Sequence, residues 1–243
     1  MGYLDIRLDP SSPTPLYLQL KSELEERIRT GALSPGEALP SERRLAEMLG
    51  VSRLTVRRAL DELVAGGMLT RRQGSGTYVT PRVEQPLSVL SGFSEDMRAR
   101  GMEPGSRFVR RERAQATPAE AMTLSLAPGE EVVRILRVRT ADGRPMAVEH
   151  AVIPARFLPE PELVKESLYG ALKERGYVPA RALERIRAVA ATDRVAGLLG
   201  VAEGTPVLYI ERVSYLPDGT PLEFTRSYYR GDRYDFVAEL RSR

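Results

Sequence analysis

The chain has 243 residues, which is enough for one or two domains whose buried core needs no metal or disulfide. Apolar residues make up 42% and charged residues 28%, a globular rather than a disordered composition. Cysteine is absent, which excludes disulfide scaffolds, cysteine nucleophiles, iron–sulfur clusters and cysteine-ligated zinc. The single histidine, His150, leaves no His/His metal spacing, so we expect neither a metal site nor a histidine-based catalytic triad.

No segment approaches the roughly 18 apolar residues of a membrane span, and the first residues lack a signal-peptide core. We therefore expect a soluble, cytoplasmic protein. The net charge of +3 says little about partners, but 33 arginines accompany only three lysines. Arginine favours bidentate contacts with phosphate and carboxylate, although genomic base composition is the simpler explanation of the total. The local distribution is more informative, because five arginines and two acids lie in residues 52–72 while residues 1–51 are net acidic.

The first predicted element is an amphipathic helix, because apolar residues recur at three- and four-residue steps from Tyr17 to Ile28. A turn-rich segment with two prolines follows it. Ser41 and Ser52 then occupy positions typical of helix N-caps, each before an apolar stripe of helical period. Gly50 is the predicted stop of the first of these two helices. The first 66 residues thus predict three helices, the second of them short.

From Met68 the apolar period changes to that of strands, and residues 69–79 predict a short hairpin with a glycine-containing tip. Residues 81–87 contain two prolines and predict a linker. We therefore expect a first domain over residues 1–80, a linker over 81–87, and a second, strand-rich domain over 88–243.

The second domain contains a weak internal repeat. Residues 117–132 and 192–207 agree at six of sixteen positions, and Asp-Gly pairs follow at 142 and 218. Each copy predicts a short helix, a strand, a two-residue Asp-Gly turn and a return strand. Two such units predict a pseudo-symmetric α+β domain whose antiparallel strands share one sheet. Chance similarity between two hairpins is the alternative.

The element order of the first domain is that of a winged helix-turn-helix. In its third helix Arg53 and Arg57 lie four residues apart and off the apolar stripe, with Thr55 between them. The N-terminal end of such a helix enters the major groove, where arginine bonds guanine and hydroxyl groups reach bases or phosphates. The alternative is that these arginines form an ordinary solvated helix face.

The predicted hairpin supplies a second set of candidate DNA contacts. Arg71 and Arg72 lie on it, and Gly74 stands at its tip. Such a basic wing follows phosphates or enters the minor groove. We therefore expect double-stranded DNA as a partner.

The first domain resembles the DNA-binding domain of the GntR family of bacterial transcription regulators. The words that carry the resemblance are PLYLQL (15–20), GALSPG (31–36), LPSER (39–43), GVSRLTVR (50–57) and GSGTYV (74–79). The resemblance implies that Arg43 also contacts DNA and that Gly74 contacts the minor groove. Position 54 is leucine where some members carry a hydroxyl residue, which speaks against a direct base contact there. The candidate DNA-binding residues are Ser41, Arg43, Ser52, Arg53, Thr55, Arg57, Arg71, Arg72 and Gly74.

The second domain resembles the UTRA effector-binding domain of the HutC-type branch, whose fold is related to chorismate lyase. The words that carry it are LSGFSEDM (90–97), RVR (137–139), DGRPMAVE (142–149), SLY (167–169), DGTPLEF (218–224) and SYYRGDRY (227–234). The whole chain is thus expected to be α+β: a winged helix-turn-helix domain followed by a chorismate-lyase-like domain with an antiparallel sheet.

Arg137 and Arg139 point to the chemistry of the second domain. They alternate by two, so both guanidinium groups leave the same face of one strand. Two inward-facing arginines are costly unless they meet an anion. The alternative is that they pair with Glu149 or Glu131. The candidate effector-binding residues are Ser91, Phe93, Arg137, Arg139, Glu149, Ser167, Tyr169, Glu223 and Tyr228.

The resemblance implies a small anionic metabolite as effector. Members that respond to amino-sugar phosphates make glucosamine-6-phosphate or N-acetylglucosamine-6-phosphate the first choice. Other sugar phosphates, histidine-pathway acids and fatty or amino acids are the alternatives within the branch. We expect a homodimer on a palindromic operator, because a single winged helix reads only a few base pairs. His150 is expected to be structural and to point to the opposite sheet face.

Two other classes of function compete with a ligand-responsive repressor. An enzyme is suggested by the lyase-related fold, but no general base lies near an activated nucleophile, so we expect no catalytic residue and no cofactor. The motif Gly74-Ser-Gly76 precedes a strand rather than a helix and is no dinucleotide fingerprint. The third hypothesis is an architectural DNA-binding protein that needs no ligand. The pair Arg137 and Arg139 and the large second domain argue against it.

Overall fold

The computed structural model describes residues 6–72, 75–80, 83–86 and 90–238. The chain divides into two compact units, Met1–Val83 and Glu84–Arg243. No helix within the described residues is long and apolar enough to cross a membrane.

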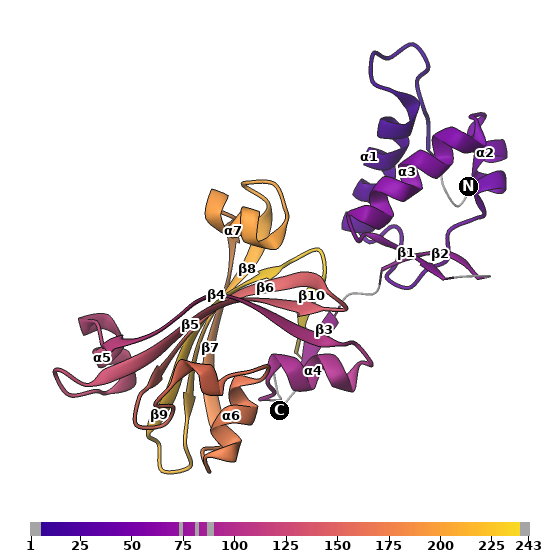
Figure 1. Ribbon diagram of the computed structural model, residues 1–243. Helices are drawn as coiled ribbons and strands as arrows, with labels where there is room; N and C mark the ends of the chain where they lie inside the picture. Colours follow the sequence, from indigo (N-terminus) through magenta and orange to yellow (C-terminus); the bar gives the residue numbers. More distant parts are fainter. Residues whose placement is uncertain (1–5, 73–74, 81–82, 87–89, 239–243) are drawn as a thin grey trace, which may run out of the picture. The chain divides into compact units, whose positions relative to one another are not determined.

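The first unit consists of three helices and a two-stranded hairpin, in the order expected from the sequence (Figure 1). The elements are α1 (Leu16–Arg29), α2 (Glu42–Leu49), α3 (Arg53–Ala65), β1 (Leu69–Arg72) and β2 (Gly76–Val79). Ser41 and Ser52 are the N-caps of α2 and α3, and their side chains accept hydrogen bonds from the Arg44 and Thr55 N–H groups. Gly50 ends α2 in the left-handed conformation that favours glycine.

The core of the first unit is the meeting point of the three helices. The buried side chains of α3 recur at helical spacing, and they are Val56, Ala59, Leu60 and Leu63, with Val64 partly buried. They pack against Leu20 and Leu24 of α1 and Leu45 of α2. The hairpin pairs antiparallel with Leu69 opposite Val79, and both of these side chains are buried. The first unit is therefore a winged helix-turn-helix.

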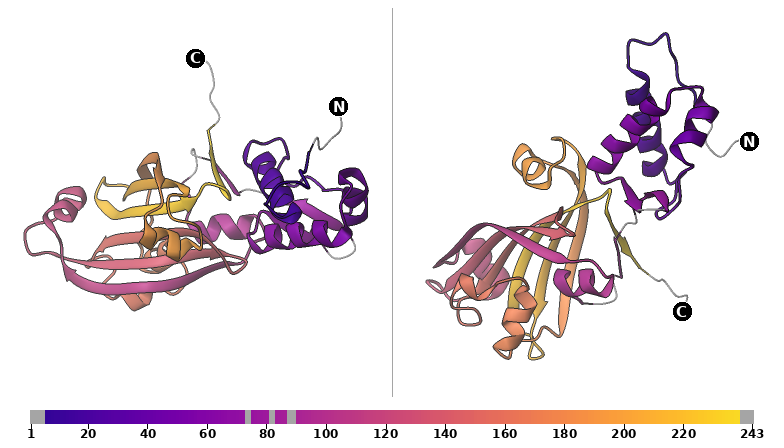
Figure 2. Two further views of the ribbon diagram at one scale, coloured as in Figure 1. Left: turned by 90° about the horizontal axis from the view of Figure 1, so that it is seen from above. Right: turned by 45° about the vertical axis from the view of Figure 1, so that its right-hand side comes forward.

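The second unit is built on one twisted, fully antiparallel sheet of six strands in the order β4-β5-β6-β9-β8-β7 (Figure 2). The strands are β4 (Pro104–Gln115), β5 (Glu131–Ala141), β6 (Arg144–Pro154), β7 (Arg181–Ala190), β8 (Pro206–Tyr215) and β9 (Pro221–Arg230). The helical segments are α4 (Phe93–Ala99), α5 (Pro118–Leu124), the 3-10 turn η1 (Pro161–Leu163), α6 (Leu168–Glu174) and α7 (Asp193–Leu199).

Helices cover both faces of this sheet. On one, here called the α6 face, Val133 and Ile135 of β5 pack against Leu168 and Leu172 of α6. On the opposite face, here called the α7 face, Val138 packs against Val195 and its neighbours of α7. Helix α5 joins a smaller core on the α7 face, around Leu124, Val132 and Val152. Odd-numbered residues of β5 therefore face α6 and even-numbered ones face α7, as the period of two requires.

The sheet order confirms that the two repeat copies share one sheet. Strands β4, β5 and β6 mirror β7, β8 and β9 about the central β6–β9 pair, with α5 and α7 in equivalent places. The first hairpin turns through Asp142 and Gly143, both with positive φ, as expected for a two-residue turn. The second hairpin differs, because β8 ends at Tyr215 and β9 begins at Pro221. Asp218 accepts a hydrogen bond from the Thr220 N–H there, which closes a longer loop.

Part of the expected linker is a strand. Residues Val83–Pro86 form β3, which pairs with the C-terminal strand β10 (Tyr234–Val237) in a separate two-stranded sheet. The expected linker residues 81, 82 and 87 lie outside the described residues. Proline is tolerated at the end of such an edge strand, so Pro86 is compatible with a strand here.

Candidate nucleic-acid interface and ligand pocket

The N-terminal turn of α3 presents arginine side chains to solvent. Arg53 is exposed and has no ion-pair partner among the described residues, and the side chain of Arg57 is 54% exposed. Thr55 is half-buried, and its hydroxyl is hydrogen-bonded to that of Ser52 at 2.8 Å within the helix cap. Leu54 is 73% exposed beside them. Arg53 is thus free to reach a groove. Arg57 donates its Nε to Glu42 Oε2 at 3.0 Å and keeps its two terminal nitrogens for another partner. The two hydroxyl groups already bond one another.

The other candidate DNA-binding arginines contact different side chains of the protein itself. Arg43 is exposed, with its Nε 3.7 Å from Glu47 one helical turn away. Arg71 lies within 3.1 Å of Glu42 and 2.6 Å of Asp61. Arg72 stacks over the Tyr78 ring, 4.9 Å from its centroid. Gly74, the expected minor-groove contact, lies outside the described residues.

A pocket opens on the α6 face of the second unit. Eight of the nine expected effector-binding residues line it: Ser91, Phe93, Arg137, Arg139, Glu149, Ser167, Tyr169 and Glu223. They come from the start of α4, the start of α6 and strands β5, β6 and β9. Gly92 also lines the pocket, and a Cβ atom there would stand 3.2 Å from the Tyr169 ring. Tyr169 thus packs directly on the backbone at Gly92.

Arg139 is a buried cation without a carboxylate partner among the described residues. Its side chain donates to the Ser94 hydroxyl at 2.6 Å, to the Glu166 carbonyl at 2.8 Å and to the Ser106 hydroxyl. Its Nε is buried and bonds nothing in the described structure. Burial, followed by the neighbouring charge of Arg137, lowers the pKa of Arg139 to about 10. A buried, under-bonded guanidinium is the arrangement that an anionic ligand would relieve.

Arg137 behaves differently, because it pairs with Glu149. Its Nε donates to Glu149 Oε1 at 2.7 Å, and its Nη2 lies 2.6 Å from the same oxygen. Burial opposes ionisation of Glu149, but the charges of Arg137 and Arg139 outweigh it and lower the pKa of Glu149. The alternative of an Arg–Glu pair is thus correct for Arg137 and Glu149. Glu131 instead pairs with Arg113 at 2.6 Å.

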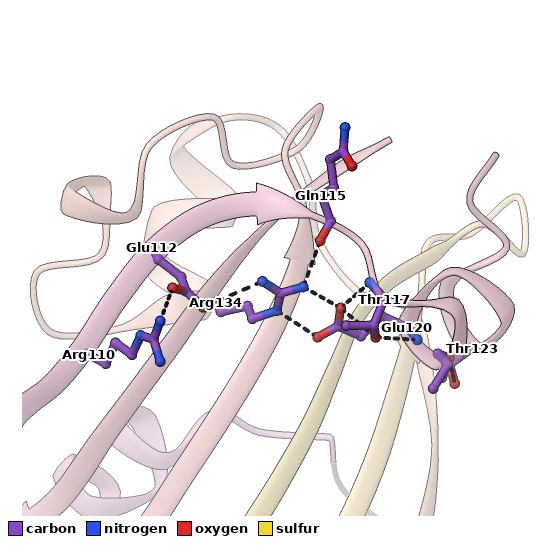
Figure 3. A network of polar contacts seen from close by, with 8 residues as sticks. Arg110, Glu112, Gln115, Thr117, Glu120, Thr123 and Arg134 are labelled. Carbon is purple, nitrogen blue, oxygen red and sulfur yellow. Dashed lines mark hydrogen bonds and ion pairs between the residues drawn. The ribbon is translucent and has the colours of Figure 1, made fainter. Parts of the chain in front are cut away.

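An arginine on the other face of β5 shows how this chain neutralises a half-buried cation. Arg134 donates to Glu120 at 2.7 and 2.8 Å and to the Gln115 carbonyl, and lies 3.5 Å from Glu112 (Figure 3). The Glu120 carboxylate also accepts from Thr117 in a capping box at the start of α5. Two carboxylates therefore surround Arg134, whereas none pairs with Arg139 in the described structure.

Glu120 predicts an acid-sensitive contribution to stability. Burial opposes its ionisation, but the Arg134 and Thr117 hydrogen bonds outweigh this and lower the pKa of Glu120 to about 2. A depressed carboxyl pKa stabilises the fold above pH 4.5, and that stability is lost as pH falls toward 2. Glu120→Gln should cost about 2 kcal/mol in urea unfolding at pH 7. The cost should shrink below pH 4.5, and a pH-independent cost would contradict this.

A second under-bonded atom in the pocket belongs to Glu223 of β9, in the same sheet as Arg139. The Glu223 Oε1 atom accepts hydrogen bonds from the Tyr169 hydroxyl at 2.6 Å and from the Ser214 hydroxyl at 2.8 Å. Its Oε2 is buried without a partner in the described structure. Burial raises the pKa of Glu223 despite these hydrogen bonds. The pocket thus presents one unsatisfied donor, at Arg139, and one unsatisfied carboxyl oxygen, at Glu223.

Tyr228, the ninth expected effector-binding residue, does not line this pocket. Tyr228 lies on the α7 face, where its ring contacts that of Tyr209 with centroids 4.9 Å apart. Glu223 and Tyr228 differ by an odd number along one regular strand, so the two side chains leave opposite faces. The next residue along the strand, Tyr229, lines the pocket instead of Tyr228.

The pocket contains residues that the sequence reasoning missed. Besides Gly92, they are Ser94, Leu168, Ile210, Arg212, Thr225, Ser227 and Tyr229. Counting in steps of two from Glu223 along β9 places Thr225, Ser227 and Tyr229 on the α6 face, so the sequence could have predicted these three. Arg212 is paired with Glu184, which the sequence pattern does not indicate.

His150 lies on the α7 face, as expected, and lines a groove there with Arg134 and Tyr228. Burial, followed by the charge of Arg226, lowers the pKa of His150. The side chain is therefore uncharged at neutral pH.

An outward-facing recognition helix in one unit and a pocket with a buried, unneutralised cation in the other are the parts of a DNA-binding regulator. Residues 16–79 match the family of bacterial regulatory proteins named gntR, and residues 99–235 match the UTRA domain. The chain belongs to the gntR family and is a transcriptional repressor of the GntR/HutC type.

Relatives of this family match over nearly their whole length. The chain is 41% identical to the HTH-type transcriptional repressor NagR of Bacillus subtilis over 236 residues, covering 96% of this chain and 97% of that protein. It is 34% identical to the mannosyl-D-glycerate transport/metabolism system repressor MngR of Escherichia coli, covering 92% and 95%. The crystal structure of PhnF from Mycobacterium smegmatis matches with a TM-score of 0.64 and 32% identity, covering 92% and 99%. NagR and MngR are both named as repressors.

Proposed function

We propose that this repressor binds a pseudo-palindromic operator as a homodimer and that a small anionic metabolite in the α6-face pocket changes its operator affinity. The observation that carries the ligand part is Arg139, a buried cation with an unbonded Nε and no carboxylate partner in the described structure. An anion placed against it would gain charge-assisted hydrogen bonds at little added desolvation.

The two under-bonded atoms suggest what the ligand carries at its ends. A phosphate or carboxylate would face Arg139 and the Ser167 hydroxyl, while an N–H or O–H group would donate to Glu223 Oε2. Any sugar phosphate has an anionic group and hydroxyl donors, and an amino-sugar phosphate adds an N–H donor for Glu223 Oε2. We therefore retain glucosamine-6-phosphate or N-acetylglucosamine-6-phosphate as first choice, with a sugar acid as the second, since the relative MngR is named for a mannosyl-D-glycerate system.

A matched set of ligands tests this assignment in a thermal-shift assay on the full chain. N-acetylglucosamine-6-phosphate carries both groups, N-acetylglucosamine lacks the phosphate, and glucose-6-phosphate lacks the amide. We expect a raised melting temperature with the first, a smaller shift with the third and none with the second. Stabilisation by the uncharged sugar alone would contradict the role of Arg139.

The DNA part of the proposal rests on Arg53 and Arg57, whose side chains face solvent at the N-terminal end of α3. That end is the one that winged helix-turn-helix proteins place in the major groove. Duplexes that the protein retains from a library of random DNA sequences should share one operator sequence. Two inverted half-sites in that sequence would support binding by a two-fold symmetric dimer.

Dimerisation is a separate prediction. One winged helix reads too few base pairs for affinities of about 10⁻⁸ M, so two copies are needed on an operator. We expect the full chain to sediment as a dimer at micromolar concentration, through an interface in the second unit. A strict monomer at that concentration, free and on DNA, would contradict the prediction.

No catalytic step is part of this proposal. Incubating the ligands above with the full chain and analysing them by mass spectrometry should return them unchanged. Conversion of any of them would favour the enzyme reading.

A further inference from the structure

One carboxylate joins the three elements of the winged helix that bear candidate DNA contacts. Glu42 is the first residue of α2, and its side chain is 22% exposed. Its Oε2 accepts a hydrogen bond from Arg57 Nε of α3 at 3.0 Å. Its Oε1 accepts a hydrogen bond from Arg71 Nη2 of β1 at 3.1 Å. Both oxygens are thus used, each by a different arginine.

The bond to Arg57 fixes the guanidinium group by its inner nitrogen. Nε is the atom that Glu42 holds, so the two terminal nitrogens, Nη1 and Nη2, are left for another partner. A bidentate contact to guanine O6 and N7 needs two donors of one guanidinium edge. Holding the long side chain in one orientation before DNA arrives reduces the entropy lost on binding.

The bond to Arg71 has a different consequence. The Nη2 of Arg71 is held by Glu42, and its Nη1 lies 2.6 Å from Asp61 of α3. Both terminal nitrogens are therefore bonded within the protein. In this structure Arg71 ties the first wing strand to α2 and α3, rather than presenting its fork to a phosphate.

We infer that Glu42 is a positioning residue for base recognition: it aims Arg57 at the major groove and, through Arg71, holds the wing. A negative charge close to the DNA phosphates is unfavourable by itself, so attraction to DNA does not account for it. The inference rests on the proposed DNA contact of Arg57.

The test compares Glu42→Gln with Glu62→Gln, in the full chain. Glu62 lies on α3, 3.4 Å from Lys21, and touches neither Arg57 nor Arg71 in the described structure. Both substitutions remove one negative charge, so both should strengthen binding to random duplex DNA to a similar, small extent. Only Glu42→Gln should lower the ratio of operator to random affinity, by about five- to tenfold.

A double-mutant cycle separates positioning from general stability. If Glu42 acts through Arg57, Glu42→Gln should have little effect on the affinity ratio when Arg57 is already alanine. Thermal melting of each variant shows whether it is folded, and Arg71→Ala tests the wing contact without altering Glu42. Arg71→Ala should lower operator affinity while leaving the salt dependence of binding nearly unchanged, since Arg71 makes no phosphate contact in this account.

Two results would overturn the inference. One is an unchanged affinity ratio in folded Glu42→Gln, and the other is an equal loss in the wild-type and Arg57→Ala backgrounds. A wild-type chain that prefers no duplex over random DNA would overturn the proposed function itself, which is a distinct outcome.

Discussion

Replacing Arg137 and Arg139 together by methionine should abolish the response of operator binding to ligand, and should weaken ligand binding at least about 100-fold. The reason is that the pocket would lose Arg139, which no carboxylate neutralises in the part of the chain that the structure describes, together with its neighbour. Operator affinity without ligand should stay within about twofold, because neither arginine belongs to the first unit. Isothermal titration with the ligand and anisotropy titration with the operator measure the two quantities.

Two further variants control this result. Arg110→Met with Arg113→Met removes the same number of charges from β4, where both arginines pair with carboxylates near the surface. This control should keep the ligand response. Arg139→Met alone avoids leaving Glu149 buried without its partner, which would otherwise cost stability. The anion site lies elsewhere if the ligand, at the same concentration, changes the operator affinity of Arg139→Met and of the double variant as it does that of the wild type.

Arg53→Ala and Arg57→Ala should each weaken operator binding by about 1–3 kcal/mol and leave ligand binding intact. Both side chains are exposed at the groove-entering end of α3. Competition between operator and random duplexes at fixed salt measures the loss of discrimination.

Arg58 supplies the matched control for these two substitutions. It follows Arg57 on the same helix, but its guanidinium group stacks over the Tyr17 ring at 3.9 Å. Arg58→Ala removes the same charge and should lower affinity for all sequences alike. If the Arg53 and Arg57 variants prefer operator over random DNA as strongly as the wild type does, these two residues do not recognise the operator sequence.

The helical part of the fold could be predicted because its determinants are local. Apolar spacing places α1 and α3, and the hydroxyl caps Ser41 and Ser52 mark the starts of α2 and α3. The repeat likewise predicted that two strand pairs share a sheet, because each copy forms its own hairpin.

What could not be predicted depends on contacts between distant parts of the chain. Strand β3 pairs with β10, some 150 residues away, so its extended form has no local signature. The ion pairs of Arg71 with Glu42 and Asp61 join a wing strand to two helices. Such pairs follow from packing geometry rather than from spacing in sequence.

Strand geometry accounts for the position of Tyr228. The period of two places both Arg137 and Arg139 of β5 in the pocket. The same period, counted from Glu223 along β9, places Tyr229 in the pocket and Tyr228 on the opposite face of the sheet.

We expect an anion in the pocket of the second unit to change the DNA affinity of the first. The most direct measurement is an anisotropy titration of the selected operator with the full chain, at constant ionic strength, with and without each anion that raises its melting temperature. A coupling of about 1–3 kcal/mol predicts a change in operator affinity of at least about fivefold with the phosphorylated amino sugar. The same sugar without phosphate should change nothing. Superimposable binding curves with every anion that stabilises the protein would contradict the account.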